Sequence, residues 1–170
     1  MALTDKLTAI ANAIRAKTGK TAKMTMAEMV TEIGELSNAS AYTTNTYLTE
    51  IASNAYINCN AISQVKFSNA TSIGMSAFKD CYNLRIADFP AATKINTYAF
   101  SNCSALGALI LRNTTQVCSL AALNALYYSG INNGTGYIYV PDSLVDSYKA
   151  ATNWSTYAAQ IKPLSEYTGG

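Results

Sequence analysis

Apolar residues recur through the middle of the chain at a fixed spacing. Ile51, Ile73, Ile95 and Val117 follow one another at intervals of 22 residues. Six further columns keep this interval: Ala55, Ala77 and Ala99; Tyr56, Phe78 and Phe100; Cys59, Cys81 and Cys103; Ile62, Leu84 and Leu106; Val65, Ala87 and Leu109; Phe67, Phe89 and Leu111. Such a period is typical of a solenoid, because each repeat buries its apolar edge against its neighbours. We therefore predict stacked repeats over residues 51–140.

Each repeat contains a turn that leads into a short strand. The run Cys81-x-x-Leu84-x-x-Ala87-x-Phe89 ends in an alternation of apolar positions, which favours a strand with one buried face. The segment from Leu106 to Leu111 is the equivalent strand one repeat later. Ile73 and Ile95 begin a second extended piece on the other side of each repeat. Stacking of equivalent repeats then gives parallel strands.

Two short amphipathic helices are predicted over residues 2–36. Their apolar stripes follow helical spacing and consist of Leu7, Ile10 and Ile14, then Met26, Met29, Val30 and Ile33. Helices of this length are unstable alone and must pack on another surface. We predict that this hairpin docks the subunit onto a larger assembly as a homo-oligomer, with a trimer expected. The alternative is that it caps the solenoid over Ile51 and Tyr56, since solenoids require caps.

The two segments that flank the repeats show other patterns. Residues 37–50 are polar and are predicted to form a linker or a capping strand. The elements expected after the third repeat are a helix from Ser119 through Leu126, a strand over Tyr137-Ile-Tyr-Val140, a helix starting at Pro141-Asp142, and a short final helix with Trp154, Tyr157 and Ile161. We interpret residues 141–170 as a C-terminal cap. Trp154 is expected to close the last repeat, and the alternative is that its ring stacks on a sugar.

Composition and charge exclude several classes of function. Charged residues make up 13% of the chain, about half the usual ~25%, and the net charge is +2. A nucleic-acid partner is not expected, because the chain has no basic stripe. Membrane insertion is not expected either, since no run of about 18 apolar residues occurs. The start of the chain lacks the pattern of a secretion signal, so we expect a protein assembled in a cytoplasm.

The residues available for chemistry are few. The chain contains no histidine, which excludes a Ser-His-Asp triad and a histidine-ligated metal. The four cysteines form no C-x-x-C pair, so a zinc site is not expected. They are predicted to be reduced, buried thiols within the solenoid. We therefore expect no catalytic residue, no cofactor and no metal, and interpret the protein as a non-enzyme.

Outward-facing strand positions are the candidates for binding a partner. They form three columns: Gln64, Ile86 and Ala108; Lys66, Asp88 and Ile110; Ser68, Pro90 and Arg112. Lys66 and Asp88 should lie side by side and attract each other by about 0.2–1 kcal/mol. Ile86 and Ile110 are apolar where a solvated strand should be polar, so either another element covers them or a partner does. The candidate set is Lys66, Ile86, Asp88, Ile110 and Arg112.

The repeat motif A-[FY]-x-x-C-x-x-[LI] at this spacing resembles the BspA-type leucine-rich repeats. The run from Tyr137 to Ala150, with Asn153-Trp-Ser155, is similar to the terminal cap of that family. The resemblance covers residues 51 to about 162. It implies an α+β fold: a short leucine-rich-repeat solenoid of parallel strands with an N-terminal helical hairpin and a helical C-terminal cap. It also implies a recognition scaffold without a catalytic motif.

A second resemblance concerns the N-terminal residues. Ile14-Arg-Ala-Lys-Thr-Gly19 and Met26-Ala-Glu-Met29 are similar to an N-terminal segment common on tail proteins of phages and prophages from Gram-positive gut bacteria. It implies a structural or receptor-binding component of a phage or phage-like tail, at the tail tip, baseplate or fibre of a virion. Its partners would be other virion proteins and a host cell-surface protein or glycan. The alternative is a leucine-rich-repeat module of a bacterial cell-surface adhesin.

Overall fold

The structure is a computed structural model and describes residues 42–169. The helical hairpin predicted over residues 2–36 and its assembly candidates lie outside the described residues. The first part of the predicted linker, residues 37–41, lies outside them as well. Its remaining residues, 42–50, are described and contain the first strand of the fold and the start of the second.

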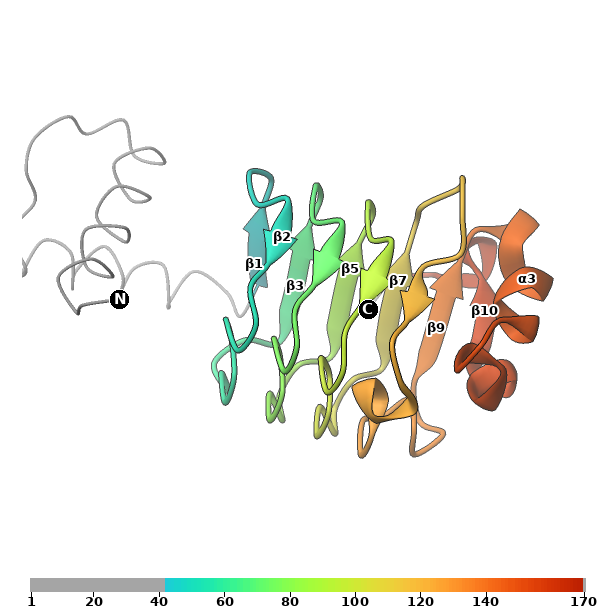
Figure 1. The fold of residues 1–170 in the computed structure, drawn as a ribbon. Helices are drawn as coiled ribbons and strands as arrows, with labels where there is room; N and C mark the ends of the chain where they lie inside the picture. The colour runs from blue at the N-terminus through green and yellow to red at the C-terminus, as the bar shows by residue number, and fades with distance from the viewer. Residues whose placement is uncertain (1–41, 170) are drawn as a thin grey trace, which may run out of the picture. The chain divides into compact units, whose positions relative to one another are not determined.

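Within residues 42–169 the chain winds through stacked turns, whose strands form two parallel sheets (Figure 1). The larger sheet has six strands: β1 (Tyr42–Asn45), β3 (Gln64–Phe67), β5 (Ile86–Phe89), β7 (Ala108–Leu111), β9 (Tyr137–Val140) and β10 (Ile161–Pro163). The smaller sheet has four: β2 (Glu50–Ile51), β4 (Ser72–Ile73), β6 (Lys94–Ile95) and β8 (Ser119–Leu120). All pairings among them are parallel, which confirms the solenoid predicted from the 22-residue period.

Short helical segments follow the strands toward the C-terminus. They are the 3₁₀ helices η1 (Leu123–Leu126), η2 (Asp142–Leu144), η3 (Trp154–Gln160) and η4 (Leu164–Glu166), and the α-helix α3 (Val145–Ala150). The strand predicted over Tyr137–Val140 has the same bounds in the structure. The helical start predicted at Pro141-Asp142 corresponds to η2 and α3.

The predicted aromatic columns form a ladder between the two sheets. Phe78 stacks on Phe100 with ring centroids 5.4 Å apart, and Phe67 stacks on Phe89 at 5.8 Å. All four rings are fully buried. The ladder continues to the half-buried ring of Tyr56, which stacks on Phe78 at 5.1 Å. Because consecutive turns supply consecutive rings, each turn depends on its neighbours for burial.

The cysteine column also lies in the core. The thiol of Cys81 donates to the carbonyl oxygen of Tyr56 over 3.0 Å, and Cys103 makes the same bond to Phe78. Burial raises the pKa of Cys81 to about 11, and it raises the pKa of Cys103 further. A thiol in this setting acts as a small apolar residue with a satisfied donor. The structural role predicted for this column is confirmed for Cys81 and Cys103, while Cys59 is only half-buried.

Tight turns between the sheets place two residues per repeat in the left-handed region, one from the column Asn54, Ser76 and Tyr98 and one from a second column. Asn58, Asp80 and Asn102 have φ values of 60°, 61° and 62°. Asn and Asp tolerate this conformation better than other residues with a side chain. The backbone N–H groups of these residues donate to carbonyl oxygens of the next turn. The N–H of Asn58, for example, donates to the carbonyl oxygen of Lys79 over 2.9 Å. This column keeps the 22-residue interval, and our sequence analysis did not recognise it.

The prediction that Val117 continues the isoleucine column is wrong. Ile95 pairs with Leu120, 25 residues further on, so this step along the small sheet is three residues longer than the repeat. The prediction of a helix starting at Ser119 is wrong as well, because Ser119 begins β8. Its amide donates to the carbonyl oxygen of Thr93 over 2.8 Å, so this segment bonds to the preceding turn and not to itself. Only η1 remains of the predicted helix.

The final predicted helix ends before Ile161. Ile161 pairs with Ile138 in the large sheet, as the first residue of β10. Pro163 contributes to this outcome, because proline lacks the amide proton for a helical hydrogen bond and disfavours helical conformation in Lys162, which directly follows Ile161. Trp154 is buried, and its Nε1 donates to the carbonyl oxygen of Cys118 over 2.6 Å. The alternative in which its ring stacks on a sugar is therefore wrong.

Candidate functional site on the outer face of the large sheet

The large sheet has one face toward the core and one face away from it. Val65, Ala87 and Leu109 are aligned in register and fully buried. Side chains alternate along a strand, so their neighbours on either side point the other way. These neighbours align as Gln64, Ile86, Ala108 and Tyr137, and as Lys66, Asp88, Ile110 and Tyr139. We call the surface that these eight residues form the outer face, and its register confirms two of the three predicted columns, Gln64 to Ala108 and Lys66 to Ile110.

Three charged residues of the candidate set meet at one point of the outer face. The Asp88 carboxylate accepts a hydrogen bond from Nε of Arg112 over 3.1 Å and lies 3.9 Å from Nζ of Lys66. A second Arg112 nitrogen reaches the carboxylate over 3.3 Å. Asp88 is 7% exposed, whereas the cations are more than a third exposed. The predicted contact of Lys66 with Asp88 is confirmed, and two cations around one carboxylate leave a local excess of positive charge.

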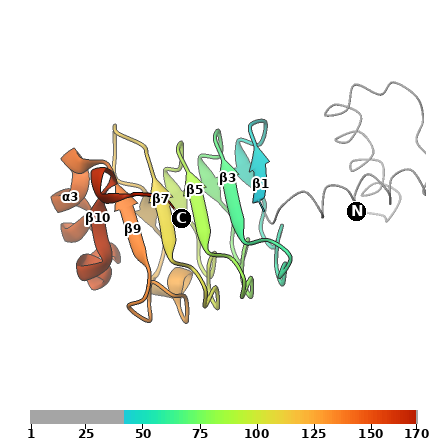
Figure 2. The same ribbon diagram turned by 180° about the vertical axis from the view of Figure 1, so that it is seen from behind.

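The structure separates the two apolar candidates. Ile110 is 1% exposed within this chain alone. The C-terminal segment of the same chain crosses the outer face from β10 over β9 toward β7 (Figure 2). The ring of Tyr167 in this segment lies 4.8 Å from that of Tyr139, which is the register neighbour of Ile110. The interpretation that a partner covers Ile110 is therefore wrong, because the chain covers it. Ile86 stays partly exposed, and its role in partner binding remains a prediction.

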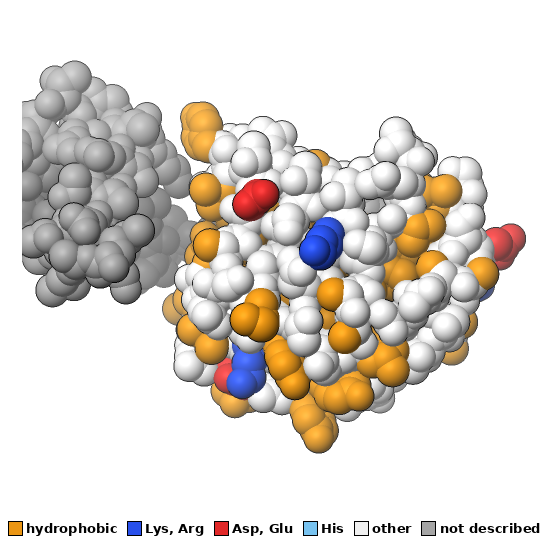
Figure 3. Space-filling model, in the orientation of Figure 1, with side chains coloured by type: hydrophobic (Ala, Val, Ile, Leu, Met, Phe, Trp, Pro, Cys, Tyr) orange, Lys and Arg blue, Asp and Glu red, His pale blue; other side chains and the backbone are white. Residues whose placement is uncertain are grey.

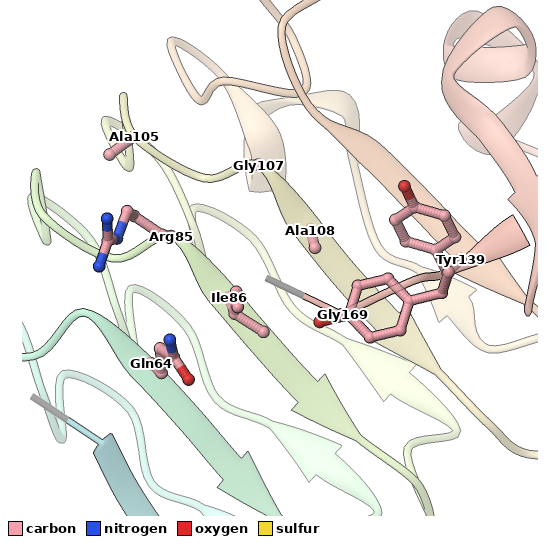
Figure 4. Close-up of a pocket in the computed structure, with 9 residues that line it drawn as sticks. Gln64, Arg85, Ile86, Ala105, Gly107, Ala108, Tyr139 and Gly169 are labelled. Atoms are coloured by element: carbon pink, nitrogen blue, oxygen red, sulfur yellow. The ribbon is translucent and has the colours of Figure 1, made fainter.

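Next to this covered part, the outer face is hollowed. The hollow has a volume of about 350 Å³ and is open to solvent. Ile86 and Ala108 lie between a polar side with Gln64 and Arg85 and an aromatic side with Tyr139 (Figure 4). The remaining lining residues are Ala105, Gly107, Tyr167 and Gly169. The lining residues therefore come from four neighbouring strands, from the turns that precede them and from the C-terminal segment. Together they form one concave site.

The charge of the hollow is unbalanced. Arg85 is exposed, and among the described residues no carboxylate lies within ion-pair distance of it. No aspartate or glutamate lines the hollow. Charged side chains are also sparse on the face drawn in Figure 3, as the composition requires. The guanidinium of Arg85 is therefore available to an anion in solution.

Our sequence analysis missed six of the nine residues that line the hollow, including its arginine and both of its tyrosines. Arg85 directly precedes Ile86, the first outward-facing residue of β5. Its position in the repeat could therefore have indicated that it lies beside the outer face. Tyr139 alternates with buried Ile138 and Val140, which is the signal of an outward position in β9. Tyr167 carries no such signal, because it reaches the sheet through the C-terminal segment and not through the repeat.

Two searches for other kinds of site gave no candidate in the described part of the chain. No group of three or more metal-ligating side chains lies together within residues 42–169. No helix of these residues is long and apolar enough to cross a membrane.

Comparisons with known proteins identify relatives of the repeat region. A family model described as "BspA type Leucine rich repeat region (6 copies)" matches residues 1–107 and 34–133. The crystal structure of a leucine-rich repeat protein from Bacteroides capillosus ATCC 29799 shares 24% sequence identity, with a TM-score of 0.48. That match covers 60% of this chain and 78% of the other. No curated protein matches.

Proposed function

The chain belongs to the BspA-type leucine-rich repeat family, and from this premise we propose that it is a recognition module that binds its partner on the outer face of the large sheet. Proteins of this kind are generally non-catalytic scaffolds suited to surface recognition. The observation that carries the proposal is the open hollow beside Asp88, lined by an unpaired arginine and by tyrosine rings. A stack of hydrogen-bonded turns holds these groups in fixed positions, which lowers the entropy cost of binding.

The biological setting that we propose is a phage or phage-like tail. The chain would be a structural or receptor-binding component of the tail tip, baseplate or fibre of a virion. It would assemble as a homo-trimer with other virion proteins through residues 1–36 and bind a host cell-surface protein or glycan. The resemblance of the segments 14–19 and 26–29 to tail proteins supports this setting. The family and the outer face fit a bacterial cell-surface adhesin equally well, so that remains the second candidate.

We further propose that residues 141–170 cap the last turn of the solenoid. Tyr148 and Trp154 support this role, because both are buried and their rings meet at 5.6 Å. The hydroxyl of Tyr148 accepts the amide proton of Cys118 over 2.8 Å. These contacts satisfy backbone groups that the end of the fourth turn would otherwise expose to solvent.

A cell-binding assay with two matched variants tests the recognition role. Ile86→Glu places a carboxylate in the hollow, whereas Met75→Glu makes the same change at an exposed apolar residue outside the outer face. The labelled full chain and both variants are added to candidate host bacteria and measured by flow cytometry. We expect Ile86→Glu to lose binding and Met75→Glu to retain it. Equal binding by all three proteins would place the binding surface elsewhere.

The setting requires a separate measurement. An antibody against the chain, labelled with gold, is applied to purified particles and to intact producer cells. Label at one end of tail particles supports the virion role. Label spread over the surface of intact cells, with none on particles, supports the adhesin and contradicts the virion.

A further inference from the structure

Among the described residues, the hollow presents one cation outside any ion pair and no aspartate or glutamate. In the described residues the ion pairs join Lys66 and Arg112 to Asp88, Lys79 to Asp80, and Lys162 to Glu166. Arg85 takes part in none of them. A guanidinium binds a carboxylate through two parallel hydrogen bonds, which makes arginine suited to anionic ligands. The unpaired position of Arg85 at the rim therefore favours a ligand with a carboxylate.

The opposite side of the hollow is aromatic. The rings of Tyr139 and Tyr167 meet at 57°, so they form an angled wall and not a flat surface. The face of an aromatic ring is electron-rich and packs well against C–H groups that carry slight positive charge. A pyranose ring presents such C–H groups on one face and hydroxyl groups at its edges. Ile86 and Ala108 add an apolar floor between the wall and the polar side (Figure 4).

The polar side also offers hydrogen bonds suited to hydroxyl groups. The amide of Gln64 both donates and accepts, as a sugar hydroxyl does. The volume of about 350 Å³ lies near the lower end of the range of roughly 300–1,000 Å³ for small-ligand sites. The site therefore fits the end of a glycan rather than a long stretch of one.

We propose that the hollow binds a sugar residue that carries a carboxylate, at the end or on a branch of a cell-surface glycan. This inference rests on the recognition role proposed above and names its ligand. The carboxylate pairs with Arg85, a hydroxyl bonds to Gln64, and the C–H face of the ring packs on Tyr139. Since the hollow is open, added salt screens the ion pair and weakens binding.

Two sugars that differ at one carbon test the proposal. Methyl β-D-glucuronide and methyl β-D-glucoside share the pyranose ring, and only the first carries a carboxylate. Each is titrated into the full chain and followed by saturation-transfer NMR. We expect the glucuronide to bind at least about tenfold more tightly, which corresponds to one charge-assisted hydrogen bond. Arg85→Gln should abolish this difference between the two sugars.

Two further variants control for charge and for site. Lys149→Gln removes one positive charge from an exposed position on α3 that does not line the hollow, so it should leave both affinities unchanged. Ile86→Trp fills the floor of the hollow and should weaken both sugars. Circular dichroism spectra of the variants confirm that each protein is folded.

Three results would overturn the inference: equal affinity for the two sugars, an unchanged preference in Arg85→Gln, or displacement of the glucuronide by benzoate at equal concentration. Displacement by benzoate would mean that the site binds a carboxylate and does not require the sugar. Each result leaves the recognition role standing if Ile86→Glu still abolishes cell binding. Retained cell binding by Ile86→Glu would instead contradict the recognition role itself.

Discussion

Replacing Phe78 by alanine tests the aromatic ladder at its most connected ring. The side chain is fully buried and stacks between Tyr56 and Phe100 at 5.1 and 5.4 Å. It also meets Phe67 and Phe89 at 6.1 and 5.8 Å. Truncation of a buried phenylalanine costs about 3–5 kcal/mol, and the cost rises with the cavity left behind. Because neighbouring turns hold the flanking rings, we expect little collapse and a loss of about 4–5 kcal/mol.

The measurement is unfolding of the full chain in guanidinium chloride and by heat, followed by circular dichroism. A loss of this size lowers the melting temperature by roughly 10–15 °C in a chain of this length. Tyr82→Ala is the matched control, since Tyr82 belongs to the same repeat and is 49% exposed. It should change stability by no more than about 0.5 kcal/mol. A shift below one degree in Phe78→Ala, or equal shifts in both variants, would refute the ladder as a source of stability.

Thiol reactivity and glycine packing give two more tests. Burial raises the pKa of Cys118 to about 12 and that of Cys103 beyond it, so thiolate is scarce at pH 8 and only Cys59 should react quickly in the folded protein. Four thiols should titrate after denaturation, and a count of two or zero would contradict reduced cysteines. A Cβ at Gly130 would lie 2.5 Å from the carbonyl oxygen of Leu106, so Gly130→Ala should destabilise by about 1–3 kcal/mol. Gly107→Ala, with its nearest neighbour at 3.7 Å, should stay within about 0.5 kcal/mol, and equal denaturation midpoints would contradict this reasoning.

The sequence was sufficient to predict the features that repeat. Stacked turns place equivalent residues in equivalent surroundings, so the period reveals the core columns and the strand register. The pairing of Val65, Ala87 and Leu109 followed from that register alone. The contact between Lys66 and Asp88 followed from it as well.

The features that break the repeat could not be predicted in the same way. The step along the small sheet from Ile95 is longer than the repeat, so Leu120 and not Val117 stacks on Ile95, and a fixed period cannot anticipate an insertion. The run from Trp154 to Ile161 has helical spacing, but pairing with β9 decides the conformation of Ile161. The hollow depends on Tyr167, which the chain brings to the sheet from outside the repeats. Tertiary contacts made by single residues leave no periodic signal.

Pro163 gives the large sheet a defined end. A stack of parallel strands can in principle extend from one molecule into the next and form an open fibre. Pro163 lies in β10, the last strand of the described sheet, and it has no amide proton to offer a further strand. Helix α3 also packs against β10. This end of the protein therefore opposes head-to-tail growth, and copies that assemble with one another must meet through other surfaces.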